Sequence, residues 1–203
     1  LGIENVKKEK LLSEAEIKRF LGIPFKREYV IVTFHPETII NEDITHQVEG
    51  LVSFITKHEE MDFVITRANA DQGGKQLNLI WEKLAEKEEH IHLFSSLGMK
   101  RYLSAVKYAR FVMGNSSSGI IEAPALGCRV LDIGDRQKGR LCSARVIHTT
   151  TKLPSIEEGY RQICENHIPQ DDQPYGDGAT SDRIVTQIKN ILWSDWQTTE
   201  KNF

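Results

Sequence analysis

The chain has 203 residues, with 26 Lys and Arg against 29 Asp and Glu, which gives a formal net charge of −3. A hydrophobic fraction of 39% and a charged fraction of 27% are typical of globular proteins and exclude a mainly disordered chain. This charge gives no general reason to bind nucleic acid or an anionic membrane, and we expect neither partner. No apolar run approaches the ~20 residues that cross a bilayer.

The start of the chain and its cysteines both argue against secretion. A polar, lysine-rich start without an initiator Met is unlike a signal peptide, and we expect a fragment or a processed form. The cysteines, Cys128, Cys142 and Cys164, are odd in number and irregularly spaced, which argues against a disulfide framework or a zinc site. His90 and His92 would share one side of a strand, but no third metal ligand is evident. We therefore expect free thiols, no metal and a cytoplasmic location.

Short β-branched and aromatic runs alternate along the chain with patterns of helical spacing. The predicted strands are residues 28–34, 62–66, 91–94, 111–113, 129–133 and 146–148. The predicted helices are residues 44–58, 76–86, 100–109, 118–126, 156–164 and 181–193. This alternation predicts an α/β fold with a doubly wound, Rossmann-like parallel sheet. We expect one domain over residues 1–203, with a long surface loop at 166–178.

In such a sheet the ligand lies outside the carboxyl ends of the strands, so the loops that follow the strands are the candidate sites. The loop of residues 114–119, Gly-Asn-Ser-Ser-Ser-Gly, lies between a predicted strand and a predicted helix; we call it the serine loop. Small residues, hydroxyls and a helix N-terminus suit an anion, and diphosphate is the natural candidate. It is neither a G-x-G-x-x-G motif nor a P-loop. The alternative is a serine that only caps the helix.

Glu122 follows about one turn into the same predicted helix. Its carboxylate could accept hydrogen bonds from a ribose diol, as acidic residues do in other nucleotide sites. The alternative is a favourable interaction with the helix dipole. Spacing alone does not separate the two.

Residues 134–140, Gly-Asp-Arg-Gln-Lys-Gly-Arg, follow the strand predicted to end at Ile133, and we call them the basic loop. Three cations within five residues suit phosphates or the edge of a base. A solvated turn is the alternative. Neighbouring parallel strands would bring the basic loop and the serine loop into one crevice.

Two further loops after strands carry weaker signals. His35 lies at the exit of the first predicted strand, where it could act as an acid, a base or a phosphate donor. A structural histidine is the alternative. After the second predicted strand, Asn69 could bind a base or a sugar amide, and the pair Gly73 and Gly74 would start the next helix.

Together these loops closely resemble one family, the UDP-N-acetylglucosamine 2-epimerases, and best its hydrolysing, sialic-acid-pathway branch. The similarity spans about residues 28–190. Its most specific part pairs Gly-Asn-Ser-Ser-Ser-Gly-x-x-Glu with Gly-Asp-Arg-Gln-x-Gly-Arg. The other matching segments are His35-Pro36, residues 69–73 and Tyr175-Gly176-Asp177-Gly178.

The resemblance implies roles for single residues. His35 matches the family's active-site histidine. The remaining matches are UDP-binding positions: Asn69; Leu97, whose backbone meets uracil; Ser116 and Ser117 for phosphate; Glu122 for ribose; and Arg136 and Arg140 for the nucleotide.

The resemblance also implies a two-domain GT-B-type fold, of which this chain is the C-terminal, nucleotide-binding domain. The N-terminal domain, with catalytic carboxylates, would be absent. Residues 4–19 resemble the interdomain region and the helix after it. Residues 181–203 would form a cross-over helix and tail, with Trp193 and Trp196 packed within the chain or on the absent domain.

The implied reaction eliminates UDP across C1–C2 of UDP-N-acetylglucosamine and then hydrates the glycal to N-acetylmannosamine. It needs no metal or redox cofactor. The partners implied are a UDP-sugar substrate, the absent domain and further copies in a homo-oligomer, a dimer or tetramer.

Several alternatives remain open. Within the family they are a non-hydrolysing epimerase and a hydrolysing epimerase that acts on UDP-diacetamido-bacillosamine. Outside it they are a GT-B UDP-sugar glycosyltransferase and a non-catalytic UDP-binding module. We expect these 203 residues alone to be inactive, because catalytic groups act as a set.

Overall fold

The computed structural model describes residues 1–24, 26–37, 43–69, 73–165 and 174–199, and of residues 194–199 only the helix. Four predicted features therefore lie outside the described residues. These are residues 70–72 of the motif after the second strand, residues 166–173 of the predicted long loop, residues 200–203 of the predicted tail, and the side chain of Trp196.

Six strands form one fully parallel sheet, in the order β3-β2-β1-β4-β5-β6. The strands are β1 (Tyr29–Thr33), β2 (Asp62–Thr66), β3 (Ile91–Phe94), β4 (Phe111–Gly114), β5 (Val130–Ile133) and β6 (Val146–Thr149). The chain builds outward from β1 to β3, returns to the far side of β1 and builds outward again. The doubly wound, Rossmann-like prediction is therefore confirmed, and its switch point lies between β1 and β4.

Each predicted helix is present, and two more precede the sheet. The helices are α1 (Gly2–Lys8), α2 (Glu14–Leu21), α3 (Ile44–Lys57), α4 (Gly74–Ala85), α5 (Gly98–Tyr108), α6 (Ser117–Ala125), α7 (Leu153–Glu165) and α8 (Thr180–Thr199). The start of α2 has a clear sequence signal, since Ser13 and Glu16 form a capping box. Gly22, in the left-handed conformation, ends the same helix.

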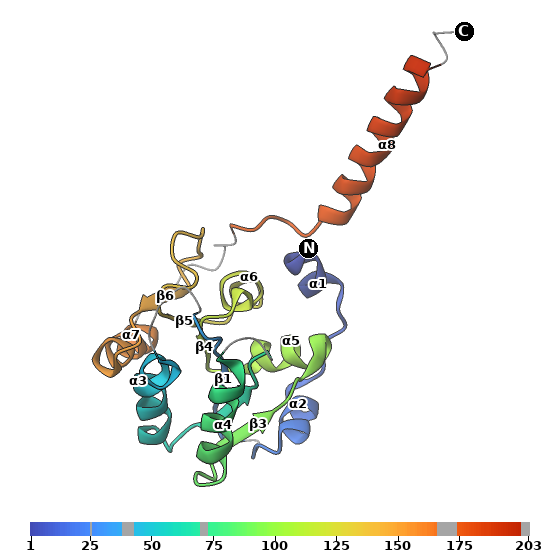
Figure 1. Cartoon of the computed structure of the whole chain (residues 1–203). Coiled ribbons are helices and arrows are strands. Elements are labelled where there is room, and N and C mark those ends of the chain that lie inside the picture. Colours follow the sequence, from blue (N-terminus) through green and yellow to red (C-terminus); the bar gives the residue numbers. More distant parts are fainter. Residues whose placement is uncertain (25, 38–42, 70–72, 166–173, 200–203) are drawn as a thin grey trace.

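Helices cover both faces of the sheet, and each face buries an apolar cluster (Figure 1). Successive residues of a strand point to opposite faces. In β1, Val30 and Val32 belong to the cluster under α3, α4 and α7, whereas Tyr29 and Ile31 belong to the cluster under α2, α5 and α6. A strand buried on both faces must be apolar at every position, which explains the continuous apolar runs in the sequence.

The last helix, α8, projects away from the body of the molecule, and its base lies beside the N-terminus (Figure 1). The carboxylate of Glu4 in α1 holds this base, accepting hydrogen bonds from the N–H (2.9 Å) and the hydroxyl (2.7 Å) of Ser181. None of the described helices is both long and apolar enough to span a membrane.

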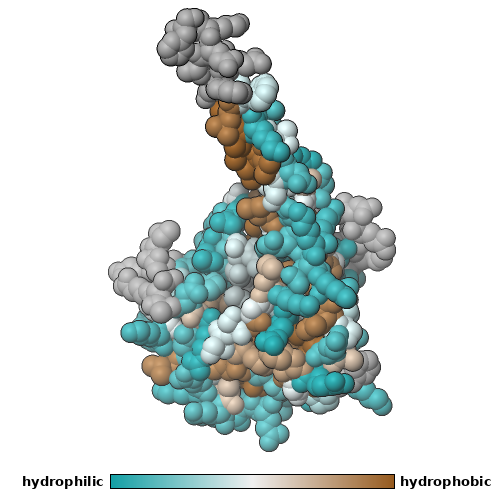
Figure 2. Space-filling model, turned by 90° about the vertical axis from the view of Figure 1, so that its right-hand side faces the viewer, coloured by the Kyte–Doolittle hydropathy of each residue, from teal (hydrophilic) through white to brown (hydrophobic). Residues whose placement is uncertain are grey.

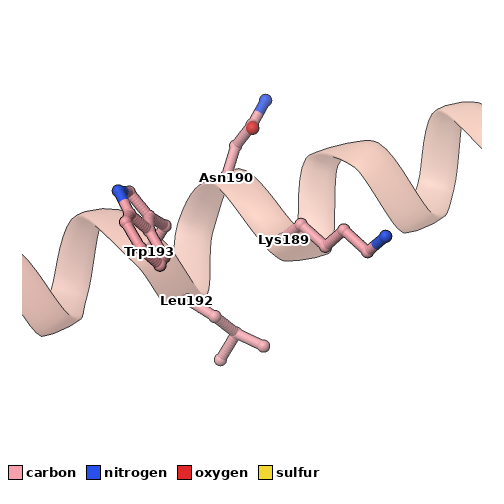
Figure 3. A pocket seen from close by; sticks show the side chains of 4 residues that line it. All are labelled: Lys189, Asn190, Leu192 and Trp193. Atoms are coloured by element: carbon pink, nitrogen blue, oxygen red, sulfur yellow. The ribbon is translucent and has the colours of Figure 1, made fainter.

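One side of α8 exposes apolar residues between 46% and 65% of their surface, namely Ile184, Val185, Ile188, Ile191 and Leu192. We call them the apolar face of α8, and Figure 2 shows this face as a stripe along the projecting helix. Trp193, which is 62% exposed, extends to another side of the helix (Figure 3). With Lys189, Asn190 and Leu192 it lines a hollow of about 490 Å³ to which only α8 contributes described side chains.

Candidate functional site

The candidate site lies at the switch point, where β1 and β4 run side by side and end together. Thr33 of β1 pairs with Gly114 of β4 at the last position of the register. Gly114 has a φ of +129°, and a Cβ at this position would overlap the carbonyl oxygen of Thr33. Glycine is therefore required by both backbone conformation and close approach.

Asn115, the next residue, joins the loops that follow three strands. It is fully buried. Its side-chain Oδ1 accepts a hydrogen bond from the His35 N–H (2.7 Å), and its Nδ2 donates to the His35 carbonyl (2.8 Å). Its own carbonyl accepts bonds from Arg136 Nη1 (2.9 Å) and Gln137 Nε2 (2.7 Å). Residues that are far apart in the sequence thus share one buried contact point.

The basic loop lies beside the serine loop, as the sequence predicted for neighbouring strands, because β4 pairs with β5. Within it Gln137 is buried, whereas Arg136 and Arg140 are exposed. Lys138 forms an exposed ion pair with Asp135 (3.2 Å). Arg136 is thus the basic-loop cation held by a hydrogen bond to the serine loop.

The serine loop leads into α6, and its hydroxyls have different surroundings. Ser116 is the N-cap residue, and its hydroxyl accepts a hydrogen bond from the Ser118 N–H (3.4 Å). Ser117 is exposed and does not cap the helix. Of these serines, Ser116 therefore caps the helix. The helix N-terminus and the Arg136 guanidinium give this region a positive potential suited to an anion.

Glu122 lies in the same helix, half-buried against α1. A Cβ on Gly2 would lie 2.6 Å from its carboxylate oxygen Oε1. Burial raises the pKa of Glu122, and hydrogen bonds from its own backbone and from Ser118 offset part of that effect. The carboxylate is therefore partly desolvated and could accept bonds from a polar ligand.

The loops after β2 and β3 are also placed at this edge of the sheet. Asn69 is exposed and follows Ala68, whose N–H and carbonyl both bond the side chain of Asn78 (2.9 Å and 3.1 Å). Gly73 caps α4 and lies against Pro36, so the loops after β1 and β2 are in contact. Leu97, which is buried, precedes the first residue of α5.

The residues that hold these loops are those to which sequence reasoning assigned no role. Asn115 belongs to the serine loop and Gln137 to the basic loop, but neither motif predicts a role for these two residues. Gln47 bonds both the N–H and the carbonyl of Glu37, and no local pattern marks it (2.9 Å and 3.3 Å). Tyr175 donates a hydrogen bond to the carbonyl of Leu141 (2.7 Å), which brings the late Tyr-Gly-Asp-Gly motif against the segment that follows the basic loop.

The histidine pair lies at the opposite edge of the sheet, where the strands begin. His90 bonds the carbonyl of Ile55 (3.1 Å), and His92 bonds the buried carboxylate of Asp62 (2.9 Å). Both line a polar hollow of about 590 Å³, together with Arg27 and several acidic residues. Among the described residues, no group of three or more His, Cys, Asp and Glu is arranged to hold a metal ion.

The fold, with its loops at the switch point, defines a doubly wound, Rossmann-like α/β protein. The S. aureus MnaA–UDP co-structure superposes with a TM-score of 0.68 at 17% identity, over 94% of this chain and 53% of that chain. Escherichia coli ADP-heptose heptosyltransferase II superposes with a TM-score of 0.54 at 10% identity, over 74% of this chain and 50% of that one.

The chain belongs to the UDP-N-acetylglucosamine 2-epimerase family, whose sequence profile matches residues 2–189. It is 29% identical over 166 residues to the GDP/UDP-N,N'-diacetylbacillosamine 2-epimerase (hydrolyzing) of Campylobacter jejuni, covering 81% of this chain and 43% of that protein. It is 36% identical over 162 residues to the polysialic acid biosynthesis protein P7 of Escherichia coli, covering 78% and 40%. The chain therefore spans less than half the length of these curated relatives.

Proposed function

We propose that this chain is the UDP-binding part of a hydrolysing UDP-N-acetylglucosamine 2-epimerase, which converts UDP-N-acetylglucosamine and water into N-acetylmannosamine and UDP. The observation that carries the proposal is the meeting of the His35 backbone, the Arg136 guanidinium and the start of α6 at Asn115. A family histidine, a cation and a helix N-terminus at one switch point suit a nucleotide diphosphate with its sugar.

The proposed reaction begins with loss of the C2 proton and departure of UDP from C1. The C2–H and C1–O bonds break, and a double bond forms between C1 and C2. Water then adds its hydroxyl to C1, and a proton returns to C2 on the opposite face. In this chain the α6 N-terminus and Arg136 stabilise charge on the departing diphosphate, while His35 holds or moves a proton beside it.

We propose the remaining residue roles from the family resemblance and their positions at this edge. Ser116 and Ser117 bind phosphate, Glu122 binds ribose, and Arg140 contacts the nucleotide. Asn69 lies in the loop after β2, and Leu97 lies in the loop after β3. Asn69 and the backbone of Leu97 bind the base.

We further propose that a second domain completes the enzyme and that the apolar face of α8 packs on it. Two observations support this: the chain covers 43% and 40% of two curated relatives, and the base of α8 lies beside the chain's first residues. The 203 residues alone should therefore bind UDP but turn over little substrate, because catalytic groups act as a set.

Saturation-transfer proton NMR of UDP-N-acetylglucosamine mixed with this chain tests binding and turnover in one sample. We expect transfer to the uridine protons and no new sugar signals. Arg136→Ala should weaken the transfer, whereas Lys138→Ala, in the same loop but paired with Asp135, should leave it unchanged.

Three outcomes would count against parts of this proposal. Absence of transfer to uridine at millimolar ligand contradicts nucleotide binding. Free N-acetylmannosamine and UDP formed by this chain alone contradict the need for a second domain. An epimerised sugar that keeps its UDP, formed by a longer form of the enzyme, contradicts hydrolysis.

A second candidate substrate is a UDP-diacetamido-bacillosamine. It is favoured by two curated relatives whose names give a diacetylbacillosamine 2-epimerase (hydrolyzing). Both substrates share UDP, so this chain should bind them similarly. Product analysis with the longer enzyme, with each sugar offered separately, decides between them.

A further inference from the structure

We propose that Asn115 is a positioning residue that fixes the backbone of His35 and the guanidinium of Arg136 against the start of α6. Its significance for the nucleotide rests on the proposed function. The contacts themselves do not depend on any ligand.

The side chain of Asn115 acts as a two-point clamp on one residue. Its amide oxygen accepts from the His35 N–H at 2.7 Å, and its amide nitrogen donates to the His35 carbonyl at 2.8 Å. Among side chains of this length, only an uncharged amide presents an acceptor and a donor side by side at neutral pH. Asn115 is fully buried, so a lost bond would leave a polar group without water to replace it.

The main chain of Asn115 extends the same connection to the other loops. Its N–H donates to the Thr33 carbonyl (3.1 Å) at the end of β1. Its carbonyl accepts from Arg136 and Gln137 (2.9 Å and 2.7 Å) of the basic loop. Every polar group of this residue is therefore used, and the next residue, Ser116, caps α6.

The turn of residues 35–37, which carries His35, is also held at Glu37. Gln47 clamps Glu37 in the same way, through its N–H (2.9 Å) and its carbonyl (3.3 Å). The Glu37 carboxylate accepts the Asp135 N–H (3.1 Å), a second link from this turn to the basic loop. The turn is therefore set before any ligand arrives, which reduces the reorganisation needed at binding.

The fold provides a matched control for the Asn115 clamp. Asn78 makes the same two bonds, but with Ala68 at the exit of β2 instead of with His35. Asn115→Asp and Asn78→Asp each replace the amide donor with a second, charged acceptor oxygen, which would face the carbonyl of His35 or of Ala68. The corresponding Ala variants remove both the donor and the acceptor. We expect all four variants to melt at lower temperature than the parent chain.

The decisive readouts are the NMR signal of the His35 imidazole, assigned by its loss in His35→Ala, and the UDP dissociation constant. We expect the Asn115 variants to shift or broaden the His35 signal and to weaken UDP binding by about tenfold or more, since small misplacements at a site are costly. The Asn78 variants should leave the His35 signal unchanged.

The Asn115 variants could melt at lower temperature and still keep the His35 signal and the UDP affinity of the parent chain. That outcome would overturn the proposal. If the parent chain does not bind UDP, the proposed function fails, while the His35 signal still tests the clamp. If the Asn115 variants do not fold, the clamp is tested by measuring amide hydrogen exchange in the parent chain. The Asn115 side-chain amide protons and the His35 N–H should then exchange slowly, and rapid exchange would refute the clamp.

Discussion

Single residues of the serine loop and of α6 have different environments, and these separate structural from ligand-binding roles. Ser116 caps the helix, Ser117 is exposed, and Glu122 is half-buried with a raised pKa. Capping and burial both affect the free energy of unfolding, whereas ligand contacts affect only the complex. Stability and affinity measured on the same variants therefore distinguish the two roles.

Ser117→Ala should weaken UDP binding with almost no change in stability, within about 0.5 kcal/mol for an exposed position. Ser116→Ala should lower the free energy of unfolding by about 1 kcal/mol, because it removes the N-cap. Chemical denaturation and calorimetric titration with UDP check both. Unchanged UDP affinity in Ser117→Ala would contradict its phosphate role.

Glu122→Gln should stabilise the chain at pH 7 while weakening binding of the ribose. Burial raises the pKa of Glu122 in the folded chain above its ordinary value of 4.5. The carboxylate therefore destabilises the folded chain as the pH rises from 4.5 through the folded-state pKa. The gain from Gln should therefore shrink as the pH falls to about 4. Thermal melts over this pH range measure it.

Glu16→Gln serves as the control of opposite sign. Hydrogen bonds from the side chain and backbone of Ser13 lower the pKa of Glu16, so the native contribution of this carboxylate is lost as the pH falls. This variant should be less stable than the parent at pH 7 and approach it in acid. The same sign of change in both variants would contradict the burial of Glu122.

At the scale of elements, the site depends on how closely β1 and β4 approach at their carboxyl ends. Gly114 permits that approach, and Asn115 then reaches the backbone of His35. The pairing of β4 with β5 brings the basic loop to the same point. The site is therefore a property of three neighbouring strands.

Gly114→Ala should destabilise the chain by at least about 2 kcal/mol, since a strained φ and a backbone overlap occur together. Gly127→Ala is the matched control. Gly127 also has a positive φ (+79°), but the space around it is open, so its cost should be only about 1 kcal/mol. Equal destabilisation of the two variants, measured by urea denaturation, would contradict the overlap at Thr33.

At the scale of the whole molecule, the unusual feature is α8, which leaves the body with its apolar face exposed (Figures 1 and 2). Exposed apolar stripes on a helix normally mark a contact with another chain or domain. The bonds from Ser181 to the Glu4 carboxylate hold the base of this helix against α1.

The chain by itself should self-associate through the apolar face of α8. The double substitution Ile188→Glu with Leu192→Glu should reduce that association, as measured by sedimentation velocity over a range of concentrations. Thr186→Glu with Asn190→Glu has the same charge and spacing on the polar side of the helix and should leave it unchanged. Equal effects of the two pairs would show that charge, rather than the apolar face, controls association.

The sequence by itself determined the order and type of the six strands and of the six helices that follow the first strand, because strands buried on both faces and helices with one buried face leave periodic apolar patterns. It therefore predicted the doubly wound sheet, and its loop motifs pointed to the family. Only the tertiary structure decided how the loops are joined. Asn115 bonds His35 across 80 residues, and Glu4 bonds Ser181 across 177. Local patterns carry no record of such pairings, since they arise when the sheet assembles and brings distant residues within hydrogen-bond distance.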